Sequence, residues 1–147
     1  MPSRASAGSQ RGPAAAEAAL LLPAVAVAAL LLFLLRAYVT DDTFIHCVFA
    51  RNLAVRGEFG FNPGQPVYGD TSPLWVALLA AGGRLGVDYL ALAKGLAFAA
   101  GVALPLLAGR WCLALGLAAA AAACAAVVVA ADASVARWSA SGMETAL

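Results

Sequence analysis

The feature that most limits how this chain can fold is an uncharged apolar run near its N-terminus, from Ala18 to Leu35. At about 1.5 Å per residue, a helix over this run is long enough to cross the hydrocarbon core of a bilayer. Two further runs follow, Cys112 to Ala131 without a charge and Tyr89 to Leu107 with only Lys94. Backbone groups in lipid must be hydrogen-bonded within the protein, so each run is expected to be a helix. We therefore predict an all-α integral membrane protein.

The composition agrees with a membrane protein and argues against two other classes. Hydrophobic residues make up 63% of the chain and charged residues only 12%, whereas soluble domains are roughly half apolar. The net charge of +1 offers no clustered basic surface, so we expect the lipid bilayer and no nucleic acid as a partner. The three cysteines show no metal-site spacing and predict neither a disulfide framework nor a zinc site.

The N-terminal end sets the expected orientation. Residues 1–13 are rich in Ser, Gly, Ala and Pro and are predicted to be a disordered cytoplasmic tail, with the membrane domain over 14–147. Arg4 and Arg11 precede the first run and favour a cytoplasmic N-terminus. A cleaved signal peptide is the alternative, but the first run is longer than the apolar region of such peptides, which is about 7–15 residues. We expect a multi-pass protein with spans over about 18–37, 89–109 and 112–131.

Two shorter segments are expected between the first and second spans. Residues 43–55 have an apolar face and predict an amphipathic helix on the membrane surface, with Asp41 or Asp42 at its start and Gly57 ending it. Residues 72–87 begin with a good helix start but are apolar only as far as Gly83, so we expect a short re-entrant or interfacial helix there. If that segment spans instead, the C-terminal residues lie across the bilayer from Asp41.

Five short strings in the chain resemble one family of membrane enzymes. The strings are Asp41-Asp42-Thr43-Phe44-Ile45, Ala50-Arg51-Asn52-Leu53, Phe61-Asn62-Pro63-Gly64, Gly69-x-Thr71-Ser72-Pro73-Leu74-Trp75 and Trp138-x-x-Ser141-Gly142-Met143-Glu144-Thr145. Together they resemble the GT-C superfamily, in a branch similar to mycobacterial arabinofuranosyltransferases. The pattern of that family has an Arg in place of Val48, a Glu in place of Tyr68 and an aromatic residue in place of Asp70.

The resemblance implies a function and a location. Such enzymes transfer a sugar from a polyprenyl-phosphate donor to a glycan or lipid acceptor outside the cytoplasm, which implies the bacterial inner membrane. The family fold has more spans than this chain, so we expect an N-terminal portion of a GT-C-like domain or a fragment. The alternative is a small non-catalytic membrane protein, or a degenerate fragment that keeps only the scaffold.

The chemistry of such a transfer names the candidate residues. A base must deprotonate the acceptor hydroxyl and cations must hold the departing phosphate. Asp41 is the working candidate for the base and Asp42 for a capping, metal-binding or positioning partner, or the reverse. His46 lies at i+4 from Asp42 and could share a divalent metal with it or orient its carboxylate. The expected donor- and substrate-binding residues are Arg51, Arg56, Asn62, Thr71, Trp75, Arg137, Trp138 and Glu144.

Several of these candidates also have purely structural interpretations. Asp41 and Asp42 could only cap a helix, and the two Trp residues fit an aromatic belt at the membrane interface. Arg51 and Arg56 could meet lipid headgroups. Glu144, close to a predicted membrane entry, is unusual enough to be a candidate functional residue.

Overall fold

The computed structural model describes residues 13–146, and the tail predicted over 1–13 lies outside them except for Pro13. Six α-helices and one short 3₁₀ helix account for most of the described residues. They are α1 (Pro13–Leu34), α2 (Asp41–Arg56), α3 (Pro73–Arg84), α4 (Tyr89–Ala114), α5 (Ala119–Ala131), α6 (Ala133–Ser141) and the 3₁₀ helix η1 (Glu144–Ala146). The all-helical prediction is confirmed for this part of the chain.

Two helices are long and apolar enough to cross a membrane, α1 over Ala15–Leu34 and α4 over its whole length. Helices α5 and α6 would make a third span if they are taken as one segment, bent by 55° at Asp132. The Asp132 side chain accepts a hydrogen bond from the backbone N–H of Val135 at 2.9 Å and so caps α6 at the bend. These helices suggest a membrane protein.

The helix over the second expected span, 89–109, is longer than that span. Helix α4 continues through Gly109 and Arg110, and the turn to α5 comes only after Ala114. Gly109 does not end the helix. It allows α1 to approach α4 closely, because a Cβ at this position would lie 2.6 Å from Leu21 of α1. Arg110 lies within the helix and pairs with Glu17 at 3.1 Å.

The helix in the third expected span, 112–131, is shorter than that span. It begins at Ala119 instead of Cys112, because residues 112–114 belong to α4. Gly116, with a φ of 78°, lies in the turn between the two helices. Small side chains then bring α5 close to α1, where Ala126 and Ala130 are buried against Ala24. Such close approach of small residues is a usual basis of helix association in lipid.

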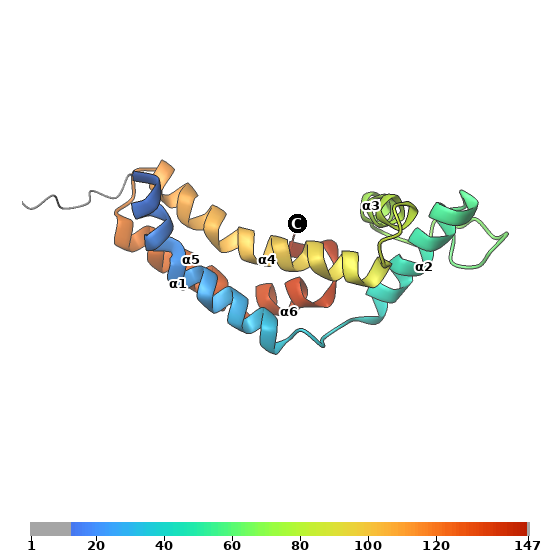
Figure 1. Cartoon of the computed structure of the whole chain (residues 1–147), viewed down its shortest axis with the longest axis horizontal. Helices are drawn as coiled ribbons and strands as arrows, with labels where there is room; N and C mark the ends of the chain where they lie inside the picture. Colours follow the sequence, from blue (N-terminus) through green and yellow to red (C-terminus); the bar gives the residue numbers. More distant parts are fainter. Residues whose placement is uncertain (1–12, 147) are drawn as a thin grey trace, which may run out of the picture.

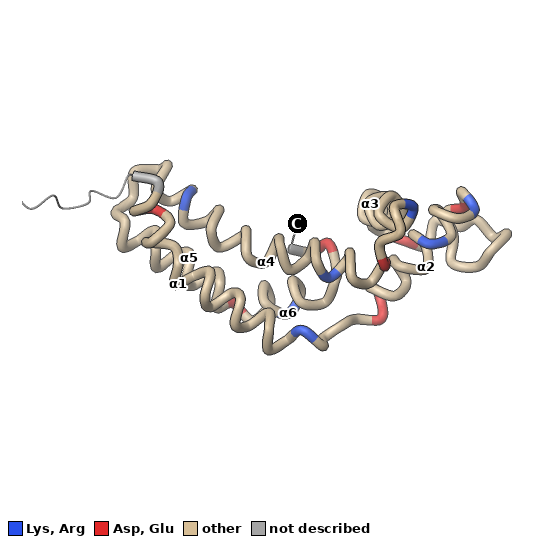
Figure 2. Tube along the Cα trace, viewed as in Figure 1, with Lys and Arg blue, Asp and Glu red and all other residues tan. Residues whose placement is uncertain are grey.

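Helices α1 and α5 run in one direction and α4 runs in the other, along the length of an elongated molecule with two ends (Figure 1). The Glu17–Arg110 pair joins the start of α1 to the last part of α4. At the other end, Lys94 near the start of α4 donates to the carbonyl oxygen of Ala140 near the end of α6 at 2.8 Å. Helices α2 and α3 extend beyond this second end, where many of the charged residues lie (Figure 2).

Helices α2 and α3 pack against each other and against the start of α4. Phe49 of α2 packs in one buried cluster with Trp75, Val76 and Leu79 of α3. Helix α3 has 12 residues and is therefore about 18 Å long, shorter than the hydrocarbon core of a bilayer. It is not among the described helices that are long enough to span. This agrees with the expected short helix over 72–87.

The predicted apolar face of α2 is wrong in part. Phe49, expected to face the membrane with its neighbours, is buried inside the protein, and so are the polar residues Thr43, His46 and Asn52. The polar residues are buried because they hydrogen-bond to segments that cover the helix: Asn52, for example, donates to the carbonyl oxygen of Gly60 at 2.8 Å. Gly57 ends α2 as expected, in the left-handed conformation with φ 72°.

Candidate functional site

A polar cavity of about 250 Å³ lies where the first half of α2 meets the segment before α3 and the C-terminal end of the chain. Its lining residues come from three parts of the sequence that are far apart. They are Asp42, Ile45, His46, Gly69, Asp70, Thr71 and Met143. The cavity therefore exists only because the fold joins these three parts.

His46 is the centre of the polar contacts. Its side chain is 5% exposed, and its Nδ1 lies 2.6 Å from Oδ2 of Asp70, whose side chain is fully buried. Its other ring nitrogen, Nε2, lies 3.6 Å from Oε2 of Glu144, beyond hydrogen-bond distance. Neither Nε2 of His46 nor Oε2 of Glu144 has a hydrogen-bond partner among the described residues. The two atoms thus face each other unpaired.

Ser72 connects the two carboxylates that flank His46. Its backbone N–H donates to Oδ1 of Asp70 at 2.8 Å, and its hydroxyl donates to Oε1 of Glu144. Ser72 is the N-cap residue of α3, as the sequence allowed, but its hydroxyl makes no capping hydrogen bond to that helix. The hydroxyl donates to Glu144 instead, and this hydrogen bond connects the start of α3 to the site.

Two contacts bring the C-terminal segment to α2. The Thr43 hydroxyl donates to the carbonyl oxygen of Ser141 at 2.9 Å across 98 positions of sequence. Gly142 then turns the chain with a φ of 89°, and a Cβ on it would lie 2.9 Å from Cγ2 of Thr43. A side chain at position 142 is therefore excluded both by conformation and by space. Glu144 follows two residues later and reaches His46.

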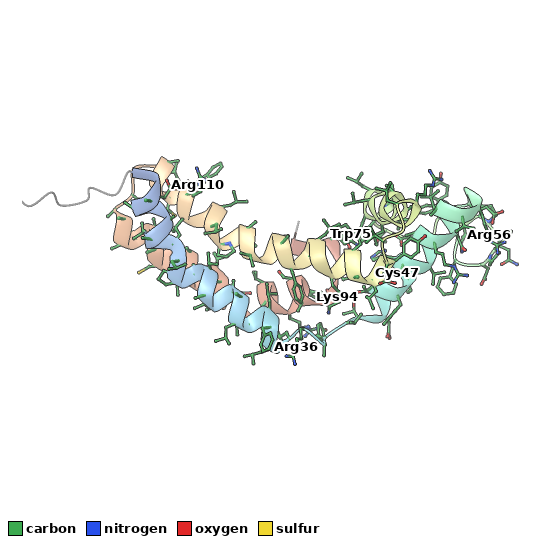
Figure 3. The ribbon with its side chains drawn as sticks, in the orientation of Figure 1. Arg36, Cys47, Arg56, Trp75, Lys94 and Arg110 are labelled. Atoms are coloured by element: carbon green, nitrogen blue, oxygen red, sulfur yellow. The ribbon has the colours of Figure 1, made fainter. Side chains whose placement is uncertain are left out.

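An apolar groove of about 620 Å³ adjoins the polar cavity. It is lined by Thr71, Ser72, Pro73, Leu74, Trp75, Leu78 and Glu144. Thr71 lines both spaces, and Glu144 lines the groove while it faces His46. Trp75, in the first turn of α3 (Figure 3), is buried, and its indole Nε1 has no hydrogen-bond partner in the described part of the chain. A polar and an apolar compartment thus meet at one place.

The structure separates the two adjacent carboxylates. Thr40 is the N-cap residue of α2, so Asp41 and Asp42 lie in its first turn. Negative charges there interact favourably with the helix dipole. Both residues are exposed, but Asp42 lines the polar cavity and Asp41 is not among the lining residues. His46 bonds to Asp70 and not to Asp42, although both Asp42 and His46 line the cavity.

Some of the other predicted binding residues line the groove, and others lie outside both the groove and the polar cavity. Thr71, Trp75 and Glu144 lie together at the groove. Arg51, Arg56 and Asn62 are exposed and line neither space. Arg137 of α6 stacks 5.6 Å from the ring centre of Tyr38, and Trp138 lines a separate cavity of about 140 Å³. Neither the polar cavity nor the groove is lined by a Lys or Arg.

Asp70 is the site residue that the sequence did not indicate. It departs from the pattern of the resembling family, and nothing in its neighbourhood points to a partner 24 positions away. The one local signal is the sequence Asp70-Thr71-Ser72, in which an Asp side chain accepts from the backbone N–H two residues on. That signal predicts a turn but not a contact with His46.

The expected metal site remains a prediction. Among residues 13–146, no group of three or more His, Cys, Asp or Glu side chains is arranged to hold a metal ion. Asp42 and His46 line one cavity but make only two ligands, and catalytic metal sites usually have three from the protein.

No family model, no curated protein and no solved structure matches this chain. Function is therefore inferred from the residues and their geometry.

Proposed function

We propose that this chain forms part of a membrane glycosyltransferase that moves a sugar from a polyprenyl-phosphate donor to a cell-envelope acceptor. The transfer would take place at the extracytoplasmic face of a bacterial inner membrane. The observation that carries the proposal is the junction of the polar cavity around His46 with the apolar groove beside α3. An amphiphilic substrate could place its polar head in the cavity and its apolar chain in the groove.

The position of this junction supports a lipid-linked substrate. It lies beyond the ends of α1 and α6 and near the start of α4, at the end of the molecule opposite Arg110 (Figure 3). A lipid carrier lying along apolar helices would present its head group at such an end. The groove, with Leu74 and Leu78 in its lining, offers apolar surface to the first part of the lipid chain.

The polar cavity supports transfer to a hydroxyl group. A sugar on a phosphate already has a good leaving group, so the enzyme needs a base and groups that position the acceptor. The imidazole and three carboxylates of the site supply both functions: His46, Asp42, Asp70 and Glu144. Asp42, on the open side of the cavity, is placed to accept hydrogen bonds from acceptor hydroxyls.

The donor phosphate needs a cation that the described linings do not supply. Arg51, five positions after His46, and Arg137, seven positions before Glu144, are the candidates for this cation. Arg guanidinium groups bind phosphate in a bidentate manner, which suits this role. The resemblance to GT-C enzymes is the further support for the sugar and for the polyprenyl carrier.

The test is a transfer assay in membranes from cells that express this chain. Membranes are incubated with polyprenyl-phosphate carrying radiolabelled arabinofuranose, mannose or glucose, and label in the envelope fraction is counted against membranes without the chain. We expect transfer from one of these donors, and a decrease of roughly 100-fold with Asp42→Asn because the acceptor loses its position. Glu17→Gln, at the far end of the molecule, is the matched control and should keep full transfer.

Two results would contradict the proposal. The first is the absence of transfer from all three donors by a chain shown to be inserted in the membrane, which would favour the non-catalytic alternative. The second is full transfer by Asp42→Asn.

A further inference from the structure

We infer that His46 accepts the proton of the acceptor hydroxyl, and that the acceptor is a sugar whose two neighbouring hydroxyls bind to His46 and Glu144. This inference rests on the proposed function and adds to it the base and the class of acceptor. It replaces Asp41, the working candidate from the sequence, which is not among the residues that line the cavity.

The two unpaired atoms carry the inference. Nε2 of His46 and Oε2 of Glu144 lie 3.6 Å apart and are both buried without a partner among the described residues. Buried polar atoms are nearly always hydrogen-bonded, so such a pair calls for a ligand that donates to both. Neighbouring hydroxyls of a sugar provide two O–H donors at a spacing that can reach both atoms. A simple lipid alcohol provides only one.

Asp70 determines which ring nitrogen of His46 is free. Its Oδ2 lies 2.6 Å from Nδ1, and the backbone N–H of Ser72 holds its other oxygen at 2.8 Å. A carboxylate at Nδ1 keeps the proton of the neutral ring on that atom and leaves the lone pair on Nε2. Asp70 is therefore a positioning residue, because it acts on the acceptor through His46.

The proton transfer balances with the groups present. The acceptor O–H bond breaks and an N–H bond forms at Nε2 of His46, while the oxygen forms a bond to the anomeric carbon of the donor. The bond from that carbon to the phosphate oxygen breaks, and its electron pair leaves on the phosphate. The resulting imidazolium lies between the carboxylates of Asp70 and Glu144, which stabilise its positive charge.

The first test measures the ring of His46 directly and needs no transfer activity. His46 is the only histidine in the chain, so protein labelled with ¹⁵N-histidine in lipid nanodiscs gives the signals of this one side chain. In the neutral form of the ring we expect the proton on Nδ1 and a bare Nε2. Asp70→Asn should give a mixture of the two tautomers. A proton on Nε2 in the unaltered protein would overturn the inference.

The second test uses transfer to octyl arabinofuranoside and to analogues that lack one of its hydroxyls. We expect His46→Gln to lower kcat by at least about 100-fold. Glu144→Gln should mainly raise KM for the diol acceptor and have little effect on an analogue that lacks the hydroxyl bound by Glu144. Full kcat in His46→Gln would overturn the assignment of the base.

The two proposals fail in different ways. If the unaltered protein transfers no sugar, the proposed function fails whatever the tautomer of His46 is. If the unaltered protein transfers sugar and His46→Gln does so equally well, only the present inference fails. The tautomer is measured on the unaltered protein. That measurement can therefore refute the inference even if His46→Gln folds poorly.

Discussion

The ammonium group of Lys94 donates a hydrogen bond to the carbonyl oxygen of Ala140 at 2.8 Å, across 46 positions of sequence. It also donates to the carbonyl oxygen of Tyr38 at 2.7 Å. Lys94 therefore joins the start of α4 to the last turn of α6 and to the link between α1 and α2. Carbonyls in the last turn of a helix have no partner within the helix, and a cation there satisfies them.

Replacement of Lys94 by Met should destabilise this end of the molecule. The variant leaves the carbonyls of Tyr38 and Ala140 without their donor, which should lower the free energy of unfolding by about 2–3 kcal/mol. Unfolding in detergent micelles, followed by circular dichroism, measures the difference. Glu17→Gln breaks a more exposed ion pair and should cost less than about 1 kcal/mol. Equal stability of the two variants would contradict this role of Lys94.

Two glycines of α4 should respond in opposite ways to alanine. A Cβ at Gly101 would lie 2.6 Å from Oγ of Ser139 in α6, whereas a Cβ at Gly95 meets nothing within 4 Å. Gly101→Ala should therefore destabilise by about 1–3 kcal/mol through overpacking. Gly95→Ala should be neutral or stabilise by up to about 1 kcal/mol, because Ala is the better helix former. The same unfolding experiment compares them, and a Gly101→Ala protein as stable as Gly95→Ala would refute the close packing of α4 on α6.

The thiol of Cys47, in α2 beside His46, should react slowly at neutral pH. Burial, together with the negative charge of Asp88, raises the pKa of this thiol to about 11. Only the thiolate is alkylated, so the raised pKa means that little thiolate is present until the pH approaches that value. In a protein with Cys112→Ala and Cys124→Ala, the rate of alkylation by iodoacetamide should still increase above pH 9. A free thiol would be close to its plateau there, since its pKa is about 8.5.

Asp88→Asn separates the two causes of this shift. Burial is the larger cause and remains in the variant, so the midpoint of the reaction should decrease but stay above that of a free thiol. A plateau of the alkylation rate near pH 9 in the parent protein would show that Cys47 is not buried as described.

The membrane helices could be predicted from the sequence because length and apolarity alone determine that such a run is helical in lipid. The end of α4 could not. Gly109 and Arg110 look like a helix end, but Gly109 provides close packing against Leu21, and Arg110 pairs with Glu17. Both contacts depend on α1, which lies far away in the sequence.

The candidate site was predicted only in part for a similar reason. Asp42 is identifiable as an acidic residue soon after the first apolar run, and Glu144 as one close to a predicted membrane entry. Asp70 is not, because its role follows from the position of His46 on another segment. The apolar face expected on α2 failed because hydrogen bonds, such as that of Asn52 to Gly60, bury its polar residues instead.

The central claim is that the cavity around His46 opens at the extracytoplasmic face, where a lipid-linked sugar would be used. Tyr68, in the segment before α3, is 98% exposed, and Leu117, in the turn between α4 and α5 at the other end, is 49% exposed. Each is changed to Cys in a chain whose own three cysteines are replaced by Ala. A membrane-impermeant maleimide is then applied to intact and to permeabilised spheroplasts.

We predict that Tyr68→Cys is labelled in intact spheroplasts and that Leu117→Cys is labelled only after permeabilisation. The reverse pattern would place the cavity in the cytoplasm and would contradict the proposed transfer. Labelling of both from outside would show that α3 and α4 together cross the membrane an even number of times, which would contradict the proposed arrangement as well.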